Sequence, residues 1–599
     1  MKLRACDVIA ILLLGSCVIN ADAQQTVPLP SPSPSEEPSE GTGIPVEPPS
    51  LVPEPIWEQS TPSLETLPLP PPPVVVKPIL PPLPLSNQFA GLAGPRVFVK
   101  RFQFTGNHIF SSASLAHVTA KYSGREITAE ELEQARQGLT MFYINNGYIN
   151  SGATLPDQNI DSGVITFRIV EGKLSEVHLK GNFWFRPWWL RNEIRRSAQG
   201  SLNFNKLRER LQLLRMNPLI ARINAELKPG GVPGESFIDV DIKDTQPFRF
   251  GLEFSNKRPP SVGSEILEAN LADLNLTGHN DPLLIRYGIV QSTEDGGFEF
   301  SGLQNIEGTY EFPITPWATT LQLHGNKSDT SIIQQPFRSL NITSNLEEYG
   351  GTIRQTVYET LSNVAAISLT ADKRRGETFL LGRPFSLSPG AVNGVTQIFV
   401  LRFAQEFVNR SQLHVLALRS TFSFGLDAFD ATNSGSEPDS RFFSWLGQSQ
   451  YVRRLGNTDR LLVLRLNLQL TNGPLFSLEQ FSLGGAESVR GYPENQILRD
   501  NGVFASGEVR LPLLYNKAHN PILFAAPFVD IGAGWNSEKS RLGSNAEALP
   551  SVGVGLIFNP NKHVQAQVYW GYAINRDVAG HGDNLQDYGF HFAVTVNAF

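Results

Sequence analysis

Hydrophobic and polar residues alternate along the C-terminal part of the chain, from residue 247 to residue 599. In segment 464–470 (LRLNLQL) every second residue is leucine and the residues between are polar. Segments 564–570 (VQAQVYW) and 248–254 (FRFGLEF) also collect apolar side chains on one face. Because successive side chains of a β-strand point to opposite faces, each segment predicts a strand with one apolar and one polar face.

Such strands are typical of a transmembrane β-barrel, which presents apolar side chains to lipid and polar ones to its lumen. Backbone groups in lipid must all be paired, so this sheet is expected to close on itself. At about 22 residues per strand and turn, the region has room for roughly 16 antiparallel strands. A soluble β-sandwich also alternates, but it would rarely need so long a continuous run of strands.

The preceding region, residues 97–245, contains an internal repeat. Segment 102–107 (FQFTGN) is echoed by 177–182 (VHLKGN), and 132–139 (LEQARQGL) aligns with 207–214 (LRERLQLL) at the same offset. Near the end of each copy, 164–170 (VITFRIV) corresponds to 237–243 (FIDVDIK). Each copy predicts a strand, a Gly-Asn turn, two helical stretches and two strands, which makes a small α+β domain with one modest core.

Both copies of the repeat contain residues that predict where a helix begins or ends. Thr128 and Glu131 have the spacing of a capping box before a helix that runs to about Tyr143. In the second copy Pro187 suits the first turn of a helix, and Pro218 is expected to end one.

The N-terminus indicates export. Lys2 and Arg4 precede an apolar run, Val8 to Ile19, and Ala21-Asp22-Ala23 fits a cleavage site, so residues 1–23 are expected to be a signal peptide. Lipidation at Cys17 remains an alternative. The only cysteines are Cys6 and Cys17. A mature chain without this segment would carry no disulfide framework and no thiol site.

Residues 24–95 form a proline-rich arm that holds 21 of the 43 prolines. Proline fixes φ and removes a backbone donor, so we expect a disordered or polyproline-like tether without helix or sheet. The run Pro70–Pro73 is expected to be locally stiff. Segment 87–94 has room for one short helical turn, so a helical plug for the barrel is not expected.

Charge and motifs argue against catalysis and nucleic-acid binding. The formal charge of −7 and the absence of a basic patch do not suit a nucleic-acid partner. The sequence has no nucleophile elbow, no phosphate loop and no histidine pair at metal-ligand spacing. The acidic residues Asp239, Asp241 and Asp244 are expected to solvate a strand and its turn. We therefore expect no enzyme activity, no cofactor and no metal.

The repeat resembles POTRA domains, and its first copy resembles the first POTRA domain of two-partner-secretion transporters. The resemblance rests on the start 102–107, on Tyr143 with Gly147-Tyr148, and on Leu155-Pro156-x-Gln158 before Glu171-Gly172. It implies a first POTRA domain at 96–172 and a second at 173–246. Within them the turn residues Gly106, Asn107, Gly181 and Asn182 mark the repeat, and the two glycines are expected to serve the turns.

The most specific motif lies in the predicted barrel. Segment 483–492 (LGGAESVRGY) resembles the conserved sixth extracellular loop of the POTRA-plus-barrel superfamily, whose core is Val489, Arg490, Gly491 and Tyr492. In that family the loop folds into the lumen and its arginine meets an aspartate in a Phe-x-Asp strand. The resemblance implies that Phe528 and Asp530 supply this partner, and a fork-like pair would fix the loop's orientation.

Together these features resemble the two-partner-secretion outer-membrane transporters (TpsB, the haemolysin and haemagglutinin exporter type), over about 500 residues from Val97 to Phe599. The resemblance implies export of a large exoprotein without nucleotide hydrolysis, periplasmic POTRA domains that bind it, and contact with outer-membrane lipid. A barrel-assembly factor and a passive channel remain alternatives. The sequence leaves open the cargo, the resting state of the pore, the oligomeric state and the use of the arm.

The chain's end gives a mixed signal. Phe590, Phe592, Val594 and Val596 alternate, and the last residue is Phe599. A terminal aromatic residue is what outer-membrane barrels present to the barrel assembly machinery, which is therefore an expected partner. Here the apolar positions are even-numbered and Phe599 is odd, which is a departure from the usual register.

Overall fold

The computed structural model describes residues 76–78, 96–290, 304–333, 337–433, 435, 438–456, 458–537, 546–578 and 582–598. The expected signal peptide, Cys17, the expected helical turn at 87–94 and Phe599 lie outside these residues. None of the helices in the described segments is long and apolar enough to cross a membrane.

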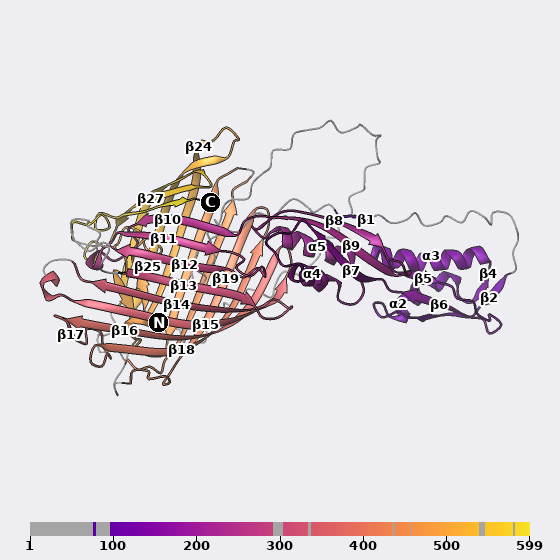
Figure 1. Cartoon of the computed structure of the whole chain (residues 1–599), viewed down its shortest axis with the longest axis horizontal. Helices are drawn as coiled ribbons and strands as arrows, with labels where there is room; N and C mark the ends of the chain where they lie inside the picture. The colour runs from indigo at the N-terminus through magenta and orange to yellow at the C-terminus, as the bar shows by residue number, and fades with distance from the viewer. Residues whose placement is uncertain are drawn as a thin grey trace, which may run out of the picture. The chain divides into compact units, whose positions relative to one another are not determined.

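The C-terminal part is a closed antiparallel β-barrel of sixteen spanning strands, as the alternation predicts (Figure 1). The first strand, β10, pairs with the last, β28, and this pairing closes the sheet. The strands are β10 (Phe248–Ser255), β11 (Ile266–Asp273), β12 (Leu283–Val290), β13 (Gln304–Pro313), β14 (Thr319–Ser331), β15 (Thr343–Glu359), β16 (Asn363–Leu380), β18 (Val395–Arg410), β19 (His414–Leu426), β20 (Phe443–Arg454), β21 (Leu461–Thr471), β24 (Asn501–Tyr515), β25 (Pro521–Trp535), β26 (Glu547–Asn561), β27 (Val564–Ala573) and β28 (Phe590–Asn597).

Smaller elements lie between the spanning strands. The two-residue strand β17 (Arg383–Pro384) extends one hairpin, and β22 (Phe481–Leu483) pairs with β23 (Ile497–Arg499) between β21 and β24. Short 3-10 helices are η3 (Pro260–Val262), η4 (Phe337–Leu340) and η5 (Ser477–Glu479).

The two faces of the barrel wall differ as expected. On β21, Leu464 and Leu466 are exposed on the outer face, whereas Gln469 is buried on the inner face. On β27, Val568 and Trp570 are likewise exposed. Exposed apolar side chains around a closed sheet suit lipid, and the buried polar side chains suit a polar lumen.

A first α+β unit precedes the barrel in the chain. Strand β3 (Arg101–Thr105) pairs parallel to β6 (Val164–Val170), and β5 (Gly152–Thr154) pairs antiparallel to it. Helices α2 (Ser112–Thr119) and α3 (Ala129–Asn145) contribute to its core, with η1 (Ala120–Tyr122) between them, and β2 (Val97–Val99) pairs with β4 (Arg125–Ile127). The capping box at Thr128 and Glu131 is confirmed.

A second α+β unit repeats this pattern. Strand β7 (Lys173–Lys180) is parallel to β9 (Glu235–Asp244), and β8 (Ile220–Pro229) is antiparallel to β9. Helices α4 (Pro187–Arg195) and α5 (Phe204–Arg215), with η2 (Arg196–Ala198) between them, supply its core. Pro187 is in the first turn of α4, as expected, and α5 ends before Pro218.

The Gly-Asn turn has the same hydrogen bond in both units. The side-chain amide of Asn107 donates to Phe110 O at 2.9 Å, and that of Asn182 donates to Phe185 O at 2.9 Å. Gly106 has a φ of +77°, and an added Cβ would lie 2.5 Å from a backbone oxygen of β6, so only glycine fits. Gly181, with a φ of +81°, makes the corresponding approach to β9.

A carboxylate closes each turn. In the first unit Glu171 accepts the N–H groups of His108 and Ile109 at 2.7 and 2.8 Å. The Tyr143 hydroxyl also donates to Glu171, and burial together with this carboxylate raises the pKa of Tyr143. In the second unit Asp244 accepts three successive N–H groups, those of residues 183–185, between 2.7 and 3.1 Å. Asp244 thus holds the turn together, whereas the sequence predicted only that it solvates the strand and its turn.

One stretch of the proline-rich arm departs from the expectation of no sheet. Strand β1 (Val76–Pro78) pairs parallel to β8 and forms the edge of the sheet, with Val76 opposite Ala225 and Pro78 opposite Leu227. Val76 is β-branched, which favours extended backbone. Pro78 ends the strand, at an edge where a missing N–H is tolerated.

Candidate functional site

The segment between β21 and β24, residues 472–500, folds as a loop with its own hairpin, β22 and β23. It contains the motif that the sequence singled out. Its apolar side chains Leu483, Val489 and Tyr492 are fully buried, in one cluster with Phe504 of β24 and Leu549 of β26. The tip of the loop therefore packs against the inner face of the wall formed by these strands.

Arg490 lies at the centre of the contact and is only 2% exposed. Its Nε donates to Asp530 Oδ2 at 2.9 Å and its Nη2 donates to Asp530 Oδ1 at 2.9 Å. The backbone N–H of Arg490 also donates to Asp530 Oδ2, at 3.1 Å. The structure thus brings together the two residues that the family resemblance paired, in the two-pronged geometry that fixes orientation as well as charge.

A second carboxylate completes the site. Glu508 of β24 forms an ion pair with Nη1 of Arg490 and accepts a hydrogen bond from Arg510 Nε at 2.8 Å. Ser506 Oγ accepts from Nη2 of Arg490 at 3.2 Å. Two arginines thus face two carboxylates, so the local charge is balanced although Arg490, Asp530 and Glu508 are buried.

Aromatic rings cover the guanidinium. Its central carbon lies 3.6 Å from the centroid of the Phe528 ring and 4.7 Å from that of Tyr569 on β27. Such cation–π contacts are stronger in a desolvated site. Phe528 of the Phe-x-Asp motif therefore shields the Arg490–Asp530 pair from water.

The remaining motif residues fix the backbone. Tyr492 donates its hydroxyl to Pro550 O at 2.9 Å and accepts the N–H of Asn575 at 3.0 Å. Gly491 has a φ of +97° and lies against the backbone of Gly571 on β27. Val489 is fully buried beside Leu483.

Reasoning from sequence missed Glu508, Ser506 and Tyr569 in this site. The alternation of segment 504–510 (FASGEVR) carried a signal, because it places Ser506, Glu508 and Arg510 on the polar, lumen-facing side of a strand. The alternation predicts which face of the strand these side chains occupy, but not their position along the barrel axis. Only the register between β24 and β25, which sets Ser506 opposite Asp530, brings these groups to Arg490.

The other singled-out residues lie elsewhere. Gly106, Asn107, Gly181 and Asn182 form the turns of the two α+β units described above, and the geometry gives them a role in the backbone of those turns.

One group in the barrel has the composition of a metal site. His324 of β14, Glu348 of β15 and Asp372 of β16 place ligand atoms within 4.8 Å of one another. Both carboxylates are already paired, however, Glu348 with Arg374 at 2.8 Å and Asp372 with Arg402 at 2.9 Å. The arrangement therefore suits a network of ion pairs better than a cation.

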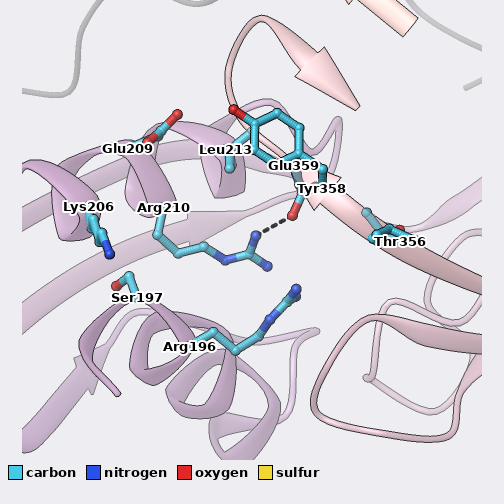
Figure 2. A pocket seen from close by; sticks show the side chains of 10 residues that line it. Arg196, Ser197, Lys206, Glu209, Arg210, Leu213, Thr356, Tyr358 and Glu359 are labelled. Atoms are coloured by element: carbon cyan, nitrogen blue, oxygen red, sulfur yellow. Dashed lines mark hydrogen bonds and ion pairs between the residues drawn. The ribbon is translucent and has the colours of Figure 1, made fainter. Parts of the chain in front are cut away.

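A cavity of about 300 Å³ lies between α5 and the end of β15 (Figure 2). Arg210 donates to Glu359 at 2.6 Å across it, and Glu209 accepts the N–H of Leu361 at 3.3 Å. Arg196 and Lys206 also line the cavity. A further contact joins Arg186 N–H to Gly278 O, at 2.8 Å, in the turn between β11 and β12.

Comparison with known proteins shows which families and relatives the chain is similar to. Residues 234–558 match the family described as haemolysin secretion/activation protein ShlB/FhaC/HecB, and residues 97–172 match the POTRA domain of ShlB type. The outer membrane transporter CdiB of Dickeya dadantii is 24% identical over 508 residues, which cover 82% of this chain and 85% of that protein. The heme/hemopexin transporter protein HuxB of Haemophilus influenzae (strain 86-028NP) is 24% identical over 497 residues, covering 79% and 81%.

Solved structures share the fold. CdiB from Escherichia coli aligns with a TM-score of 0.65 and 20% identity over 87% of this chain and 93% of that one. CdiB from Acinetobacter baumannii aligns with a TM-score of 0.59 and 14% identity over 85% and 90%. The chain belongs to the haemolysin secretion/activation protein ShlB/FhaC/HecB family and is an outer-membrane transporter of the two-partner-secretion type, with its POTRA region in the periplasm.

Proposed function

We propose that this transporter threads an unfolded exoprotein through the barrel lumen, and that loop 472–500 must leave its seat on the wall for the cargo to pass. The observation that carries the proposal is the burial of Arg490 between Asp530 and Glu508 at the inner wall. A loop fixed inside the lumen by buried ion pairs occupies the space that an extended chain needs. The cargo is a large exoprotein of the adhesin or haemolysin kind.

In this proposal the Arg490–Asp530 ion pair holds loop 472–500 against the wall, and we call this pair the lock. Removing one partner of a buried ion pair leaves an uncompensated charge and typically costs about 3–5 kcal/mol. An Arg490 that left the wall would leave Asp530 and Glu508 facing each other with only Arg510 to balance them. Cargo entering the lumen must supply contacts that offset this cost, so the closed arrangement is favoured when no cargo is present.

The two α+β units receive the cargo in the periplasm. We infer that the second unit is also a POTRA domain, because its sheet pairs as the first one does, with one parallel and one antiparallel neighbour for the central strand. An exposed sheet edge offers unpaired backbone groups to an extended peptide. The parallel pairing of β1 with β8 supports the idea that this edge accepts an extended segment.

The chain carries no catalytic step in this proposal, and no cofactor takes part. The exoprotein folds outside the cell, and a folded product cannot slip back, which gives the transport its direction. The exposed apolar residues of the barrel wall contact outer-membrane lipid, and the barrel assembly machinery inserts the barrel.

A secretion assay tests the proposal. The transporter is expressed in an outer-membrane-bearing host with and without a candidate exoprotein, and the medium and the periplasm are probed for cargo. We expect cargo in the medium only when the transporter is present. Cargo that stays in the periplasm beside a folded, inserted barrel would contradict the export function and direct the test to barrel insertion.

Deletion of residues 97–245 tests the role of the α+β units in the same assay. The barrel should still be inserted, as shown by a heat-dependent shift of its band on a denaturing gel, but export should be lost. Normal export by this variant would refute the proposed recognition role.

A further inference from the structure

Loop 472–500 touches a second part of the barrel wall before it reaches the Arg490 site. The 3-10 helix η5 ends at Glu479, whose side chain is 4% exposed. Arg402 of β18 donates to this carboxylate twice, from Nη2 to Oε1 at 2.7 Å and from Nη1 to Oε2 at 3.0 Å. Arg374 of β16 donates from Nη1 to Oε1 at 3.2 Å. A single loop carboxylate is thus held by two arginines of the wall.

The wall holds these arginines in place by itself. Arg402 Nε donates to Asp372 Oδ2 at 2.9 Å, and Arg374 Nε donates to Glu348 Oε1 at 2.9 Å. Arg374 Nη2 also pairs with Glu348, at 2.8 Å, and Arg402 Nη1 also donates to Ser423 Oγ at 2.9 Å. Nη1 of Arg374 and both Nη atoms of Arg402 reach Glu479 of the loop. Because the wall already orients Arg374 and Arg402, these side chains lose little freedom when the loop docks. Their contact with Glu479 is therefore stronger than one between two flexible side chains.

Apolar contacts accompany the ion pairs. Leu475 and Phe476 of the loop are buried in one cluster with Ile398 and Val400 of β18 and with Phe442. Phe476, Ile398 and Val400 have no exposed surface. Segment 475–479 is therefore held against the wall by apolar packing as well as by ion pairs.

The two attachments lie on different strands of the barrel. Arg490 binds β24 and β25, whereas Glu479 binds β16 and β18. Strands β19, β20 and β21 run between β18 and β24 in the sheet. No residue takes part in both sets of ion pairs. Breaking one attachment therefore leaves the other chemically intact.

We propose that Glu479 is a positioning residue that anchors loop 472–500 through Arg374 and Arg402, independently of Arg490, and that the lumen opens only when both anchors are released. This inference rests on the proposed role of the loop as the element that closes the lumen. It assigns to β16 and β18 a function in gating that the Arg490 motif does not reveal.

Channel recordings in planar lipid bilayers test the independence of the two anchors. The variants are Glu479→Gln, which removes the charge at nearly constant shape, Arg490→Ala, and the combination of both. We expect each single variant to raise the open fraction at least tenfold. The double variant should raise it by about the product of the two single effects, because attachments that share no residue contribute independently to the closed state.

Two further variants separate charge from packing. Glu479→Asp keeps the carboxylate, and in the Arg490→Ala background it should stay closer to the closed state than Glu479→Gln does. Glu377→Gln is the matched control, because it breaks an exposed pair with Arg375 on the same strand, β16, without touching the loop. It should leave the recordings unchanged, and all variants must show the heat-dependent gel shift of a folded barrel.

The outcomes distinguish this inference from the proposed function. If Glu479→Gln changes nothing in either background, Glu479 is not an anchor and the inference is wrong. If Arg490→Ala leaves both export and the channel unchanged while Glu479→Gln opens it, the proposed lock at Arg490 is wrong and Glu479 alone holds the loop.

A reversible cross-link provides a test that does not depend on the ion pairs. A Cβ added to Gly376 of β16 would lie 3.8 Å from Leu478 Cδ1, so Gly376→Cys and Leu478→Cys can be joined by a short bis-methanethiosulfonate reagent, which forms a disulfide with each thiol and releases methanesulfinate. The sequence contains no cysteine beyond Cys17. In the Arg490→Ala, Glu479→Gln background the link should restore closure, and reduction should reopen the channel. A linked channel that stays open would overturn the proposal.

Discussion

Gly491 of the loop and Gly571 of β27 touch backbone to backbone. A Cβ added to Gly491 would lie 2.8 Å from the carbonyl carbon of Gly571, and one added to Gly571 would lie 2.6 Å from the nitrogen of Gly491. Neither distance is tolerated without a shift of the backbone. The loop can therefore sit at this depth only because both positions lack a side chain, and this depth is what lets Arg490 reach Asp530.

Gly571→Ala should lift the tip of the loop from the wall without altering any charge. We expect overpacking to cost roughly 1–3 kcal/mol and to raise the open fraction of the channel in bilayer recordings. Gly308→Ala on β13 is the control, because an added Cβ there meets no atom within 4 Å. Equal behaviour of the two variants would show that the close approach does not hold the loop.

Arg490→Ala should impair export and destabilise the closed loop by about 3–5 kcal/mol, because it leaves Asp530 and Glu508 buried without their partner. Arg490→Lys should be only a partial substitute, since an ammonium group cannot donate in the two-pronged geometry. The measurement is the amount of cargo in the medium, normalised to folded barrel. Normal export by Arg490→Ala would show that the family role does not transfer to this chain.

Reversal of the pair, Arg490→Asp with Asp530→Arg, exchanges the two charges but is not expected to restore the closed loop. The structure argues against recovery, because the loop carboxylate would then face Glu508. We expect the reversed pair to export no better than Arg490→Ala. Adding Glu508→Gln should improve export, and a full recovery by the two-residue reversal would mean that Glu508 does not contribute to the site.

Asp244→Ala should loosen the turn that follows β7. The carboxylate accepts three N–H groups, and hydrogen bonds to a charged group are each worth about 1.5–3 kcal/mol. Hydrogen exchange of the amides of residues 183–185 in the full-length protein should become at least tenfold faster. Asp241→Ala, on the same strand, is the control, and similar exchange in both variants would contradict the role of Asp244.

His178 should titrate above the ordinary histidine value. Its ring is hydrogen-bonded to Glu176 at 2.8 Å and to Asp239 at 2.9 Å, and these carboxylates raise the pKa of His178. The protonated ring is therefore favoured in the folded unit. Its stabilising contribution is fully present below the pKa of the unfolded chain and is lost as the pH rises through the folded pKa. NMR titration of histidine-labelled protein measures this value, and Glu176→Gln should lower it.

The alternation of apolar and polar residues was sufficient to predict a closed barrel of roughly sixteen strands, because a membrane sheet has one lipid face, one lumen face and no tolerated edge. The offset repeat predicted two α+β units with matching turns, because each unit is built from local elements whose caps and glycines are visible in the sequence. The motif around Arg490 pointed to Asp530 through a family resemblance rather than through local physics.

The rest was decided by tertiary structure. Glu508 joins the Arg490 site from β24, and Tyr569 and Gly571 join it from β27. Glu479 reaches Arg374 and Arg402 from a loop position 77 residues beyond Arg402. The sequence determined which face of each strand is polar, because the side-chain period of a strand is two. The sequence did not determine which polar residues contact one another, because those contacts depend on strand register and on the path of one loop inside the barrel. Neither the register nor the loop path produces a periodic pattern of residues along the chain.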